Sequence, residues 1–232
     1  MQFLIHYRHV ADLTHPLSAE FPSWGGVPAF NRVTQATLDR DGWNYGAWSL
    51  SEHIGTHFDA PSHRSNGAAA HEVPAEALVG PLIVISITAK AAANPDATLS
   101  LRELRDWEQQ RGLIPSGAVI AMHSGWEARL NTPGFRNADA EGVLHFPGFA
   151  PDAADFLLRE REVIGLAVDT LSLDPGCAQD FPVHSLWLGA GRWGLECVAN
   201  LRAVPPIGAT IVVGAPKVVG ASGGPARVLA IW

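Results

Sequence analysis

Three histidines and an aspartate share one positional parity in a short segment of the chain. Residues 51–63 read Ser-Glu-His-Ile-Gly-Thr-His-Phe-Asp-Ala-Pro-Ser-His, with His53, His57, Asp59 and His63 at odd positions. In an extended chain, side chains two residues apart point to the same side, so these polar groups face one way and the apolar residues between them face the other. A helix would not achieve this, because Asp59 would lie about 200° around the axis from His57. The segment therefore predicts extended backbone.

The same segment must also bend. A straight strand at about 3.3 Å per residue would hold His53 and His57 about 13 Å apart. Ligands of one ion lie only about 2.1 Å from it. Gly55 tolerates positive φ and Pro61 has a locked φ, so these two residues are expected to permit and fix the bends.

Imidazole and carboxylate together are a ligand set for divalent Zn, Mn or Fe. Two or three such ligands leave positions open for water and substrate, which is typical of a catalytic site, and the ion lowers the pKa of its water toward about 7. The alternative is that each histidine is an ordinary residue bonded to the backbone. The shared parity of the four residues, with Gly55 and Pro61 between them, favours the metal site.

Strand and helix signals are mixed without strict alternation, which predicts an α/β or α+β class with a partly antiparallel sheet flanked by helices. Strands are expected at residues 10–14, 32–38, 43–50, 81–88, 118–122, 163–168, 210–213 and 226–231. The first three are expected to pair with one another as an antiparallel sheet. Helices are expected at residues 100–112, where Ser100 and Glu103 have capping-box spacing, at 151–161 and at 181–188.

Composition limits the functional classes. The formal net charge of -7 excludes a generic nucleic-acid binder, which needs a basic face. With 47% hydrophobic residues, the 232 residues can form a substantial core, and we expect one domain over residues 1–232.

No apolar run approaches the roughly 20 residues of a membrane span. Cys177 and Cys197 form no CxxC motif and residues 1–10 lack a secretory core, so we expect a soluble, cytoplasmic protein.

The segment from His53 to His63, His-Ile-Gly-Thr-His-Phe-Asp-Ala-Pro-Ser-His, resembles the HxGTHxDxPxH signature of the cyclase family of metal-dependent hydrolases. That family includes bacterial kynurenine formamidases, isatin hydrolases and a trans-dienelactone hydrolase. Residues 168–175, Val-Asp-Thr-Leu-Ser-Leu-Asp-Pro, resemble its G-x-D-T-x-S-x-D-P stretch, and His184 and Glu196 keep its twelve-residue separation. The resemblance implies a fold of swivelling β/β/α type. It also implies homodimers or homotetramers in which loops of one subunit close the site of its neighbour.

The resemblance further implies a ligand set. His53, His57 and Asp59 would bind a first divalent ion, and His184 and Glu196 would complete a second position. Asp59 and Glu196 would bridge where two ions are held. The implied cofactor is one or two ions of Zn or Mn per chain. From the residues alone, Glu196 lies in an apolar strand, where burial of its carboxylate is costly without a cation.

Further residues are expected to act around these ligands. His63 matches the general acid/base of the family, which can exchange a proton because it is not a metal ligand. Trp24 matches a substrate-contacting tryptophan, although Gly-Gly-Val-Pro follows it here where relatives have Pro-Gly-Asp. His123 is either a substrate contact or a structural residue. Asp169 and Thr170, at the end of a strand, are expected to orient loops or metal ligands through hydrogen bonds.

These features predict a metal-dependent hydrolase that opens a small amide, lactam or lactone by attack of metal-bound hydroxide. A kynurenine formamidase-like reaction, N-formylkynurenine to kynurenine and formate, fits the aromatic residues, and isatin or a dienelactone is the alternative. A non-catalytic metal- or ligand-binding protein is the rival from another class, and ring closure or dehydration is a third reading. No role is assigned to the remaining histidines His6, His9, His15, His71 and His145.

Overall fold

The computed structural model describes residues 7–232, so His6 and the start of the N-terminal segment lie outside the described residues. The strands are Val10–Asp12 (β1), Phe30–Ala36 (β2), Tyr45–Leu50 (β3), His57–Asp59 (β4), Val79–Ser86 (β5), Thr98–Leu99 (β6), Val119–His123 (β7), Gly148–Phe149 (β8), Gly165–Val168 (β9), Trp193–Glu196 (β10), Ala209–Gly214 (β11), Gly223–Pro225 (β12) and Arg227–Ile231 (β13). The α-helices are Leu38–Asp41 (α1), Thr88–Ala93 (α2), Leu101–Arg111 (α3), Pro151–Glu160 (α4) and Pro182–Gly189 (α5). Short 3-10 helices include Pro61–His63 (η1) and Leu201–Ala203 (η6).

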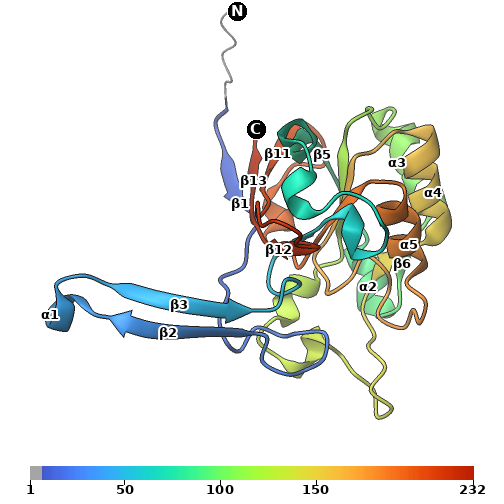
Figure 1. The fold of residues 1–232 in the computed structure, drawn as a ribbon. Helices are drawn as coiled ribbons and strands as arrows, with labels where there is room; N and C mark the ends of the chain where they lie inside the picture. Colours follow the sequence, from blue (N-terminus) through green and yellow to red (C-terminus); the bar gives the residue numbers. More distant parts are fainter. Residues whose placement is uncertain (1–6) are drawn as a thin grey trace, which may run out of the picture.

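A nine-stranded mixed sheet forms the centre of the molecule, in the order β1-β13-β11-β5-β7-β9-β10-β4-β12. The neighbours β5, β7, β9 and β10 are parallel, whereas the pairs on either side of this central group are antiparallel. Helices α3, α4 and α5 lie together on one side of the sheet (Figure 1). The predicted single α+β domain with a partly antiparallel sheet is confirmed.

The alternation of side chains along β5 explains why the sheet is buried on both faces. Ile83 and Ile85 belong to the core cluster that includes the residues of α3, α4 and α5, whereas Leu82 and Val84 belong to the cluster on the opposite face. Successive side chains of a strand point to opposite faces, so an uninterrupted apolar run fits a strand covered on both sides.

The capping box at the start of α3 is confirmed. The Ser100 side chain accepts a hydrogen bond from the Glu103 backbone N–H, and the Glu103 carboxylate accepts one from the Ser100 N–H. The helix ends at Arg111, before Gly112 with a φ of 93°. Among residues 7–232, none of the helices is sufficiently long and hydrophobic to pass through a bilayer.

The expectation that the first three strands form one antiparallel sheet is wrong in part. Strands β2 and β3 do pair antiparallel, and they project from the body as an arm with α1 at its tip (Figure 1). Strand β1 instead pairs with β13, next to the end of the chain, at the edge of the large sheet. The reason is long-range: β13 offers β1 a free edge, which local turn signals between residues 13 and 30 do not reveal.

Candidate active site and metal centre

Adjacent strands β4 and β10 bring together three of the predicted ligands. His57 and Asp59 lie two residues apart on β4, and Glu196 of β10 lies directly opposite His57 in the antiparallel register. Opposite residues of a ladder share a face, so the three side chains converge on one side of the sheet. Gly194 lies opposite Asp59, and a Cβ there would be 3.4 Å from Asp59 Oδ2 and 2.8 Å from Leu173 Cδ1. The missing side chain of Gly194 therefore leaves space for the buried carboxylate.

A turn before β4 carries His53 back to the same carboxylate. Gly55 has a φ of 70°, in the left-handed region that glycine adopts without strain, and η1 begins at Pro61. His53 Nδ1 lies 2.7 Å from Asp59 Oδ1, and its Nε2 lies 2.9 Å from the Ser222 hydroxyl oxygen. The bends predicted at Gly55 and Pro61 are therefore present, and they place His53 beside Asp59.

Helix α5 supplies His184 from the other side of the cluster. His184 Nε2 lies 3.0 Å from Glu196 Oε1 and 3.6 Å from Asp59 Oδ2. The other ring nitrogen, Nδ1, lies 2.7 Å from Asp174 Oδ2. Asp174 is fully buried and also accepts hydrogen bonds from the backbone N–H groups of Val183 and His184. This carboxylate thus fixes both the start of α5 and the orientation of the imidazole.

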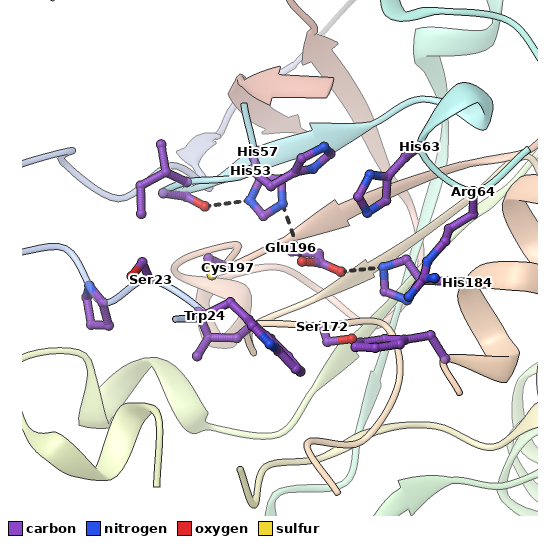
Figure 2. A pocket seen from close by; sticks show the side chains of 15 residues that line it. Ser23, Trp24, His53, His57, His63, Arg64, Ser172, His184, Glu196 and Cys197 are labelled. Atoms are coloured by element: carbon purple, nitrogen blue, oxygen red, sulfur yellow. Dashed lines mark hydrogen bonds and ion pairs between the residues drawn. The ribbon is translucent and has the colours of Figure 1, made fainter. Parts of the chain in front are cut away.

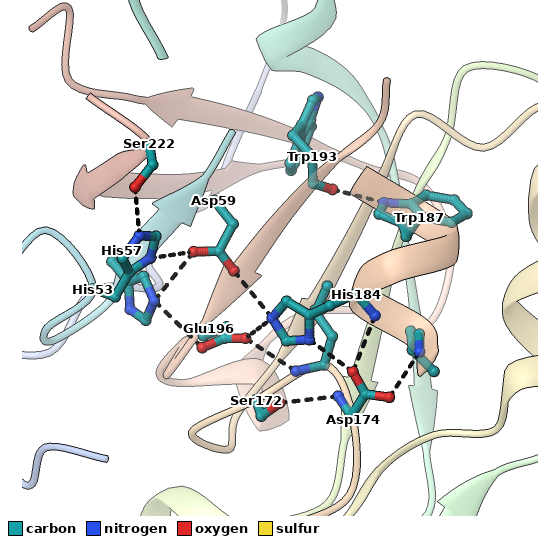
Figure 3. Close-up of polar contacts among 12 residues, drawn as sticks. His53, His57, Asp59, Ser172, Asp174, His184, Trp187, Trp193, Glu196 and Ser222 are labelled. Carbon is teal, nitrogen blue, oxygen red and sulfur yellow. Dashed lines mark hydrogen bonds and ion pairs between the residues drawn. The ribbon is translucent and has the colours of Figure 1, made fainter. Parts of the chain in front are cut away.

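All three imidazoles are held in the same way. Each has one ring nitrogen bonded to an oxygen at the edge of the cluster, which is Ser222 Oγ for His53, the Gly55 carbonyl for His57 and Asp174 for His184. The remaining nitrogen of each ring points toward Asp59 or Glu196 (Figure 3). Hydrogen bonds of this kind orient metal-ligating histidines and fix their tautomers.

The cluster leaves buried polar atoms without a hydrogen bond. His57 Nε2 lies 3.3 Å from Glu196 Oε2 and 3.4 Å from Asp59 Oδ1 but bonds to neither, and Asp59 Oδ2 is also unsatisfied. Unsatisfied buried polar groups are costly, and a cation between them would remove that cost. His53, His57 and Asp59 place ligand atoms within 4.8 Å of one another, and so do Asp59, His184 and Glu196. The residues therefore fit a divalent ion, and Asp59 is common to both groups.

The electrostatics of the ligands agree with such a site. Burial disfavours the charged form of His57, but the carboxylates of Asp59 and Glu196 outweigh burial and raise its pKa to about 10. Burial likewise opposes the protonation of His184, yet hydrogen bonds to Asp174, Asp59 and Glu196 raise its pKa well above the usual value. Burial raises the pKa of Asp59, but the neighbouring His57 lowers it well below its usual range. This carboxylate is therefore ionised and ready to bind a cation.

His63 lies beside the ligands but belongs to neither group of converging atoms. It ends η1, and its ring centroid lies 3.9 Å from that of His53 and 5.9 Å from that of His184. Burial lowers the pKa of His63, so its imidazole is neutral at pH 7. A neutral imidazole next to the cluster can accept a proton.

The cluster lies at the floor of a cavity of about 350 Å³ (Figure 2). The cavity is lined by Pro22, Ser23, Trp24, His53, Ile54, Gly55, His57, His63, Arg64, Leu171, Ser172, Phe181, His184, Glu196 and Cys197. Trp24 forms part of an aromatic wall, with its ring centroid 5.4 Å from that of Phe181 and 5.9 Å from that of Phe146. The structure thus places Trp24, His63 and the predicted ligands at this cavity, except for Asp59, which is fully buried and does not line it.

Two residues singled out in the sequence lie elsewhere. Asp169 is buried and accepts hydrogen bonds from the backbone N–H groups of Ser124, Gly125 and Trp126 and from the Ser124 hydroxyl. It orients a loop, as expected. His123 lines a separate hollow with Trp107 and other residues, so it is not a contact of this cavity.

Sequence reasoning assigned no role to several residues that complete the site. Asp174 was noted only as part of a motif, although an aspartate shortly before a predicted helix that carries a ligand is a signal for an anchor. Ser222 had no signal, because it lies 169 residues from the His53 that it contacts. Arg64 and Phe181 also line the cavity, and no spacing rule relates them to it.

Comparisons with known proteins agree with this geometry. Residues 11–175 match the model of the Cyclase family, described as "Putative cyclase". The chain is 33% identical over 243 residues to isatin hydrolase of Roseibium aggregatum, covering 96% of this chain and 91% of that protein. It is 28% identical over 220 residues to kynurenine formamidase of Salinibacter ruber, covering 93% and 94%. The solved structure of isatin hydrolase A from Labrenzia aggregata bound to benzyl benzoate has a TM-score of 0.89 and 36% identity, covering 96% of this chain and 93% of that chain.

The fold is an α+β domain built on a mixed sheet. Its histidines and carboxylates converge beside the imidazole of His63, which is the arrangement of a hydrolase with a candidate metal centre. The chain belongs to the cyclase family and is a hydrolase of that family. The resemblance drawn from His53 to His63 is therefore confirmed.

Proposed function

We propose that this enzyme hydrolyses a small amide or lactam attached to an aromatic ring, with one or two ions of Zn or Mn held by His53, His57, Asp59, His184 and Glu196. The observation that carries the proposal is that Asp59 belongs to both groups of ligand atoms beneath the cavity, while His63 stands free beside them. A divalent ion bound there supplies Lewis acidity, which polarises a carbonyl and lowers the pKa of water.

The chain's own residues account for the proton transfers. Amide nitrogen is a poor leaving group until it is protonated, so the reaction needs a group that first takes a proton from water and then returns it to nitrogen. His63 suits both steps, because burial lowers its pKa and it has no role as a ligand. His53 and His184, with one ring nitrogen each held by Ser222 and Asp174, keep the ligand geometry fixed during these steps.

The aromatic wall favours a ring-bearing substrate. Trp24 and Phe181 can hold a planar ring against the side of the cavity, and Trp24 is 41% exposed and open to contact. Relatives are named isatin hydrolase and kynurenine formamidase, and both names denote cleavage of a carbon–nitrogen bond next to an aromatic ring. Isatin and N-formylkynurenine are therefore the first substrates to test, with a simple lactone as a third.

The test compares metal-loaded and chelator-treated protein on isatin, N-formylkynurenine and the lactone in water labelled with ¹⁸O. We expect turnover of an aromatic amide or lactam by the metal-loaded protein only, with one ¹⁸O in the product. Turnover without incorporation of the label would indicate ring closure or dehydration. Metal binding without turnover of any substrate would favour a non-catalytic binding protein.

We also propose that the enzyme is a homodimer or homotetramer and works in the cytoplasm. The β2–β3 arm carries exposed apolar side chains, with Trp48 70% exposed, Leu38 61% and Trp43 55%. Exposed apolar surface of this kind is typical of a protein interface. Light scattering of the wild type and of a Trp48→Ser variant tests the assembly: a dimer that Trp48→Ser weakens supports it, and a monomeric wild type contradicts it.

Both cysteines are free thiols, which fits a reducing compartment.

A further inference from the structure

Arg64 is a permanent cation at the edge of the cavity. It follows His63 directly and caps η1, where its backbone N–H bonds to the Pro61 carbonyl at 3.3 Å. Ser65 anchors the next position, because its hydroxyl donates to the same carbonyl at 2.7 Å. The backbone of Arg64 is therefore held at the end of η1, next to His63. The Arg64 side chain lines the cavity on the same side as His184 (Figure 2).

Phe181 holds the guanidinium in place. The Arg64 Cζ atom lies 4.4 Å from the centroid of the Phe181 ring, which is within the range of a cation–π contact. Phe181 has a φ of 48°, a left-handed conformation that is uncommon for an aromatic residue and must be supported by its surroundings. In that conformation its ring contacts Arg64, Trp24 and His184 at once.

The charge of Arg64 is not neutralised. Among residues 7–232, no carboxylate forms an ion pair with Arg64, whereas Arg161 and Arg227, for example, are paired with Glu108 and Asp12. Of the described residues, Glu196 is the one carboxylate that lines the cavity, and it lies beside His57 and His184 at the floor. A guanidinium placed over an aromatic ring still has N–H groups, which can bind a carboxylate in a bidentate way.

The formal charge of the chain is -7, so an anionic molecule needs a local positive group to enter the cavity. We propose, building on the proposed function, that Arg64 stacked on Phe181 is a specificity-determining residue that binds an acidic group of the substrate. The preferred substrate is then an aromatic amide or lactam that carries a carboxylate away from the bond that is cleaved. The aromatic ring lies against Trp24 and Phe181, the carbonyl lies over the metal ligands, and the carboxylate meets Arg64.

The test uses matched substrates on the metal-loaded enzyme. Isatin is compared with its ring carboxylates, and N-formylaniline with the formamidobenzoates. We expect at least one carboxylate-bearing member to have a kcat/KM about tenfold or more above its neutral parent, mainly through KM. In Arg64→Gln that ratio should fall about tenfold, and Arg64→Lys should retain part of it. Arg102→Gln, on an exposed face of α3, is the matched control and should leave the ratio unchanged.

A binding measurement separates this proposal from the proposed function. The three benzene dicarboxylates and benzoate are titrated into metal-loaded wild-type and Arg64→Gln protein by calorimetry. Tighter binding of one dicarboxylate by the wild type, lost in Arg64→Gln, supports the role of Arg64 even if no substrate is turned over. If both proteins prefer the dicarboxylate over benzoate to the same extent, the role of Arg64 is overturned. The same holds if the wild type turns over neutral and acidic substrates equally well, and in both cases the proposed hydrolysis is unaffected.

Discussion

One carboxylate oxygen of Asp174 contacts His184 at two atoms. Asp174 Oδ2 accepts the backbone N–H of His184 at 3.0 Å and lies 2.7 Å from the ring Nδ1. The other oxygen accepts the backbone N–H of Val183 at 2.7 Å. A single buried side chain therefore sets the start of α5 and aims His184 Nε2 at Glu196.

Asp174→Asn should weaken metal binding while the fold is retained. The amide has one acceptor oxygen instead of two, so it cannot keep all three contacts, and loss of such a partner typically costs about 10–100-fold in metal affinity. Competition with a chelator of known affinity measures the effect. Asp155→Asn on α4, where the carboxylate pairs with Arg159 at the surface, is the control. Wild-type affinity in Asp174→Asn would show that His184 does not depend on this anchor.

Two alanine variants should separate metal binding from proton transfer. His57→Ala removes a ligand, so it should lose both metal and activity. His63→Ala should keep the metal and lose about 10²–10⁴-fold in kcat, because only the proton transfer is removed. Metal content and turnover are measured on the same samples. Activity that persists in a metal-free His57→Ala protein would contradict the mechanism.

Metal affinity should rise with pH. The carboxylates around His57 raise its pKa to about 10, so its imidazole is in the protonated, cationic form at pH 7 before an ion binds. The pKa of His184 is also raised well above its usual value, chiefly by its hydrogen bond to Asp174. An ion must displace the extra proton of His57. Calorimetry in two buffers of different ionisation enthalpy should therefore show proton release at pH 7. Binding without proton release, or an affinity that does not change between pH 6 and 9, would argue against these histidines as ligands.

The same pKa shift predicts how the metal-free chain responds to alkali. The pKa of His57 is raised from 6.5 to about 10, so its contribution to stability is complete below pH 6.5 and is lost as the pH rises through about 10. Urea unfolding of metal-free protein between pH 6 and 10 should show this decline, and His57→Gln should reduce it. If the free energy of unfolding falls equally with pH in the wild type and in His57→Gln, the raised pKa of His57 is contradicted.

Asp169→Ala should destabilise the protein. The substitution leaves the buried backbone N–H groups of Ser124 and Trp126, and the partly buried one of Gly125, without their acceptor. Since each unsatisfied buried group costs about 1–3 kcal/mol, a loss of about 3 kcal/mol or more in the free energy of unfolding is expected. Urea unfolding of metal-loaded protein measures it, with Asp155→Ala, which removes only a surface ion pair with Arg159, as the reference. A loss below about 1 kcal/mol would mean that water replaces the carboxylate.

Local patterns in the sequence predicted much of the site. The odd-number parity from His53 to His63, with Gly55 and Pro61 as bends, is a property of neighbouring residues, and it indicated the extended segment that the structure contains as β4 and its flanking turns. The capping box of Ser100 and Glu103 likewise marked the start of α3. Such features need only bond geometry and side-chain chemistry.

Contacts between distant segments could not be predicted in this way. The pairing of β1 with β13 joins the two ends of the described chain, and the contact of His53 with Ser222 spans 169 residues. The stacking of Arg64 on Phe181 depends on where α5 packs against η1. These contacts follow from the packing of the whole sheet, which no local period encodes.

The central claim is that hydrolysis requires an ion held by this ligand set. Metal-free protein is titrated with Zn or Mn, and bound metal, by plasma emission, is compared with turnover of the best aromatic amide or lactam at each point. We predict that turnover is absent without metal, rises with occupancy and reaches its limit at one or two ions per chain. Full turnover in protein that contains no metal would contradict the account.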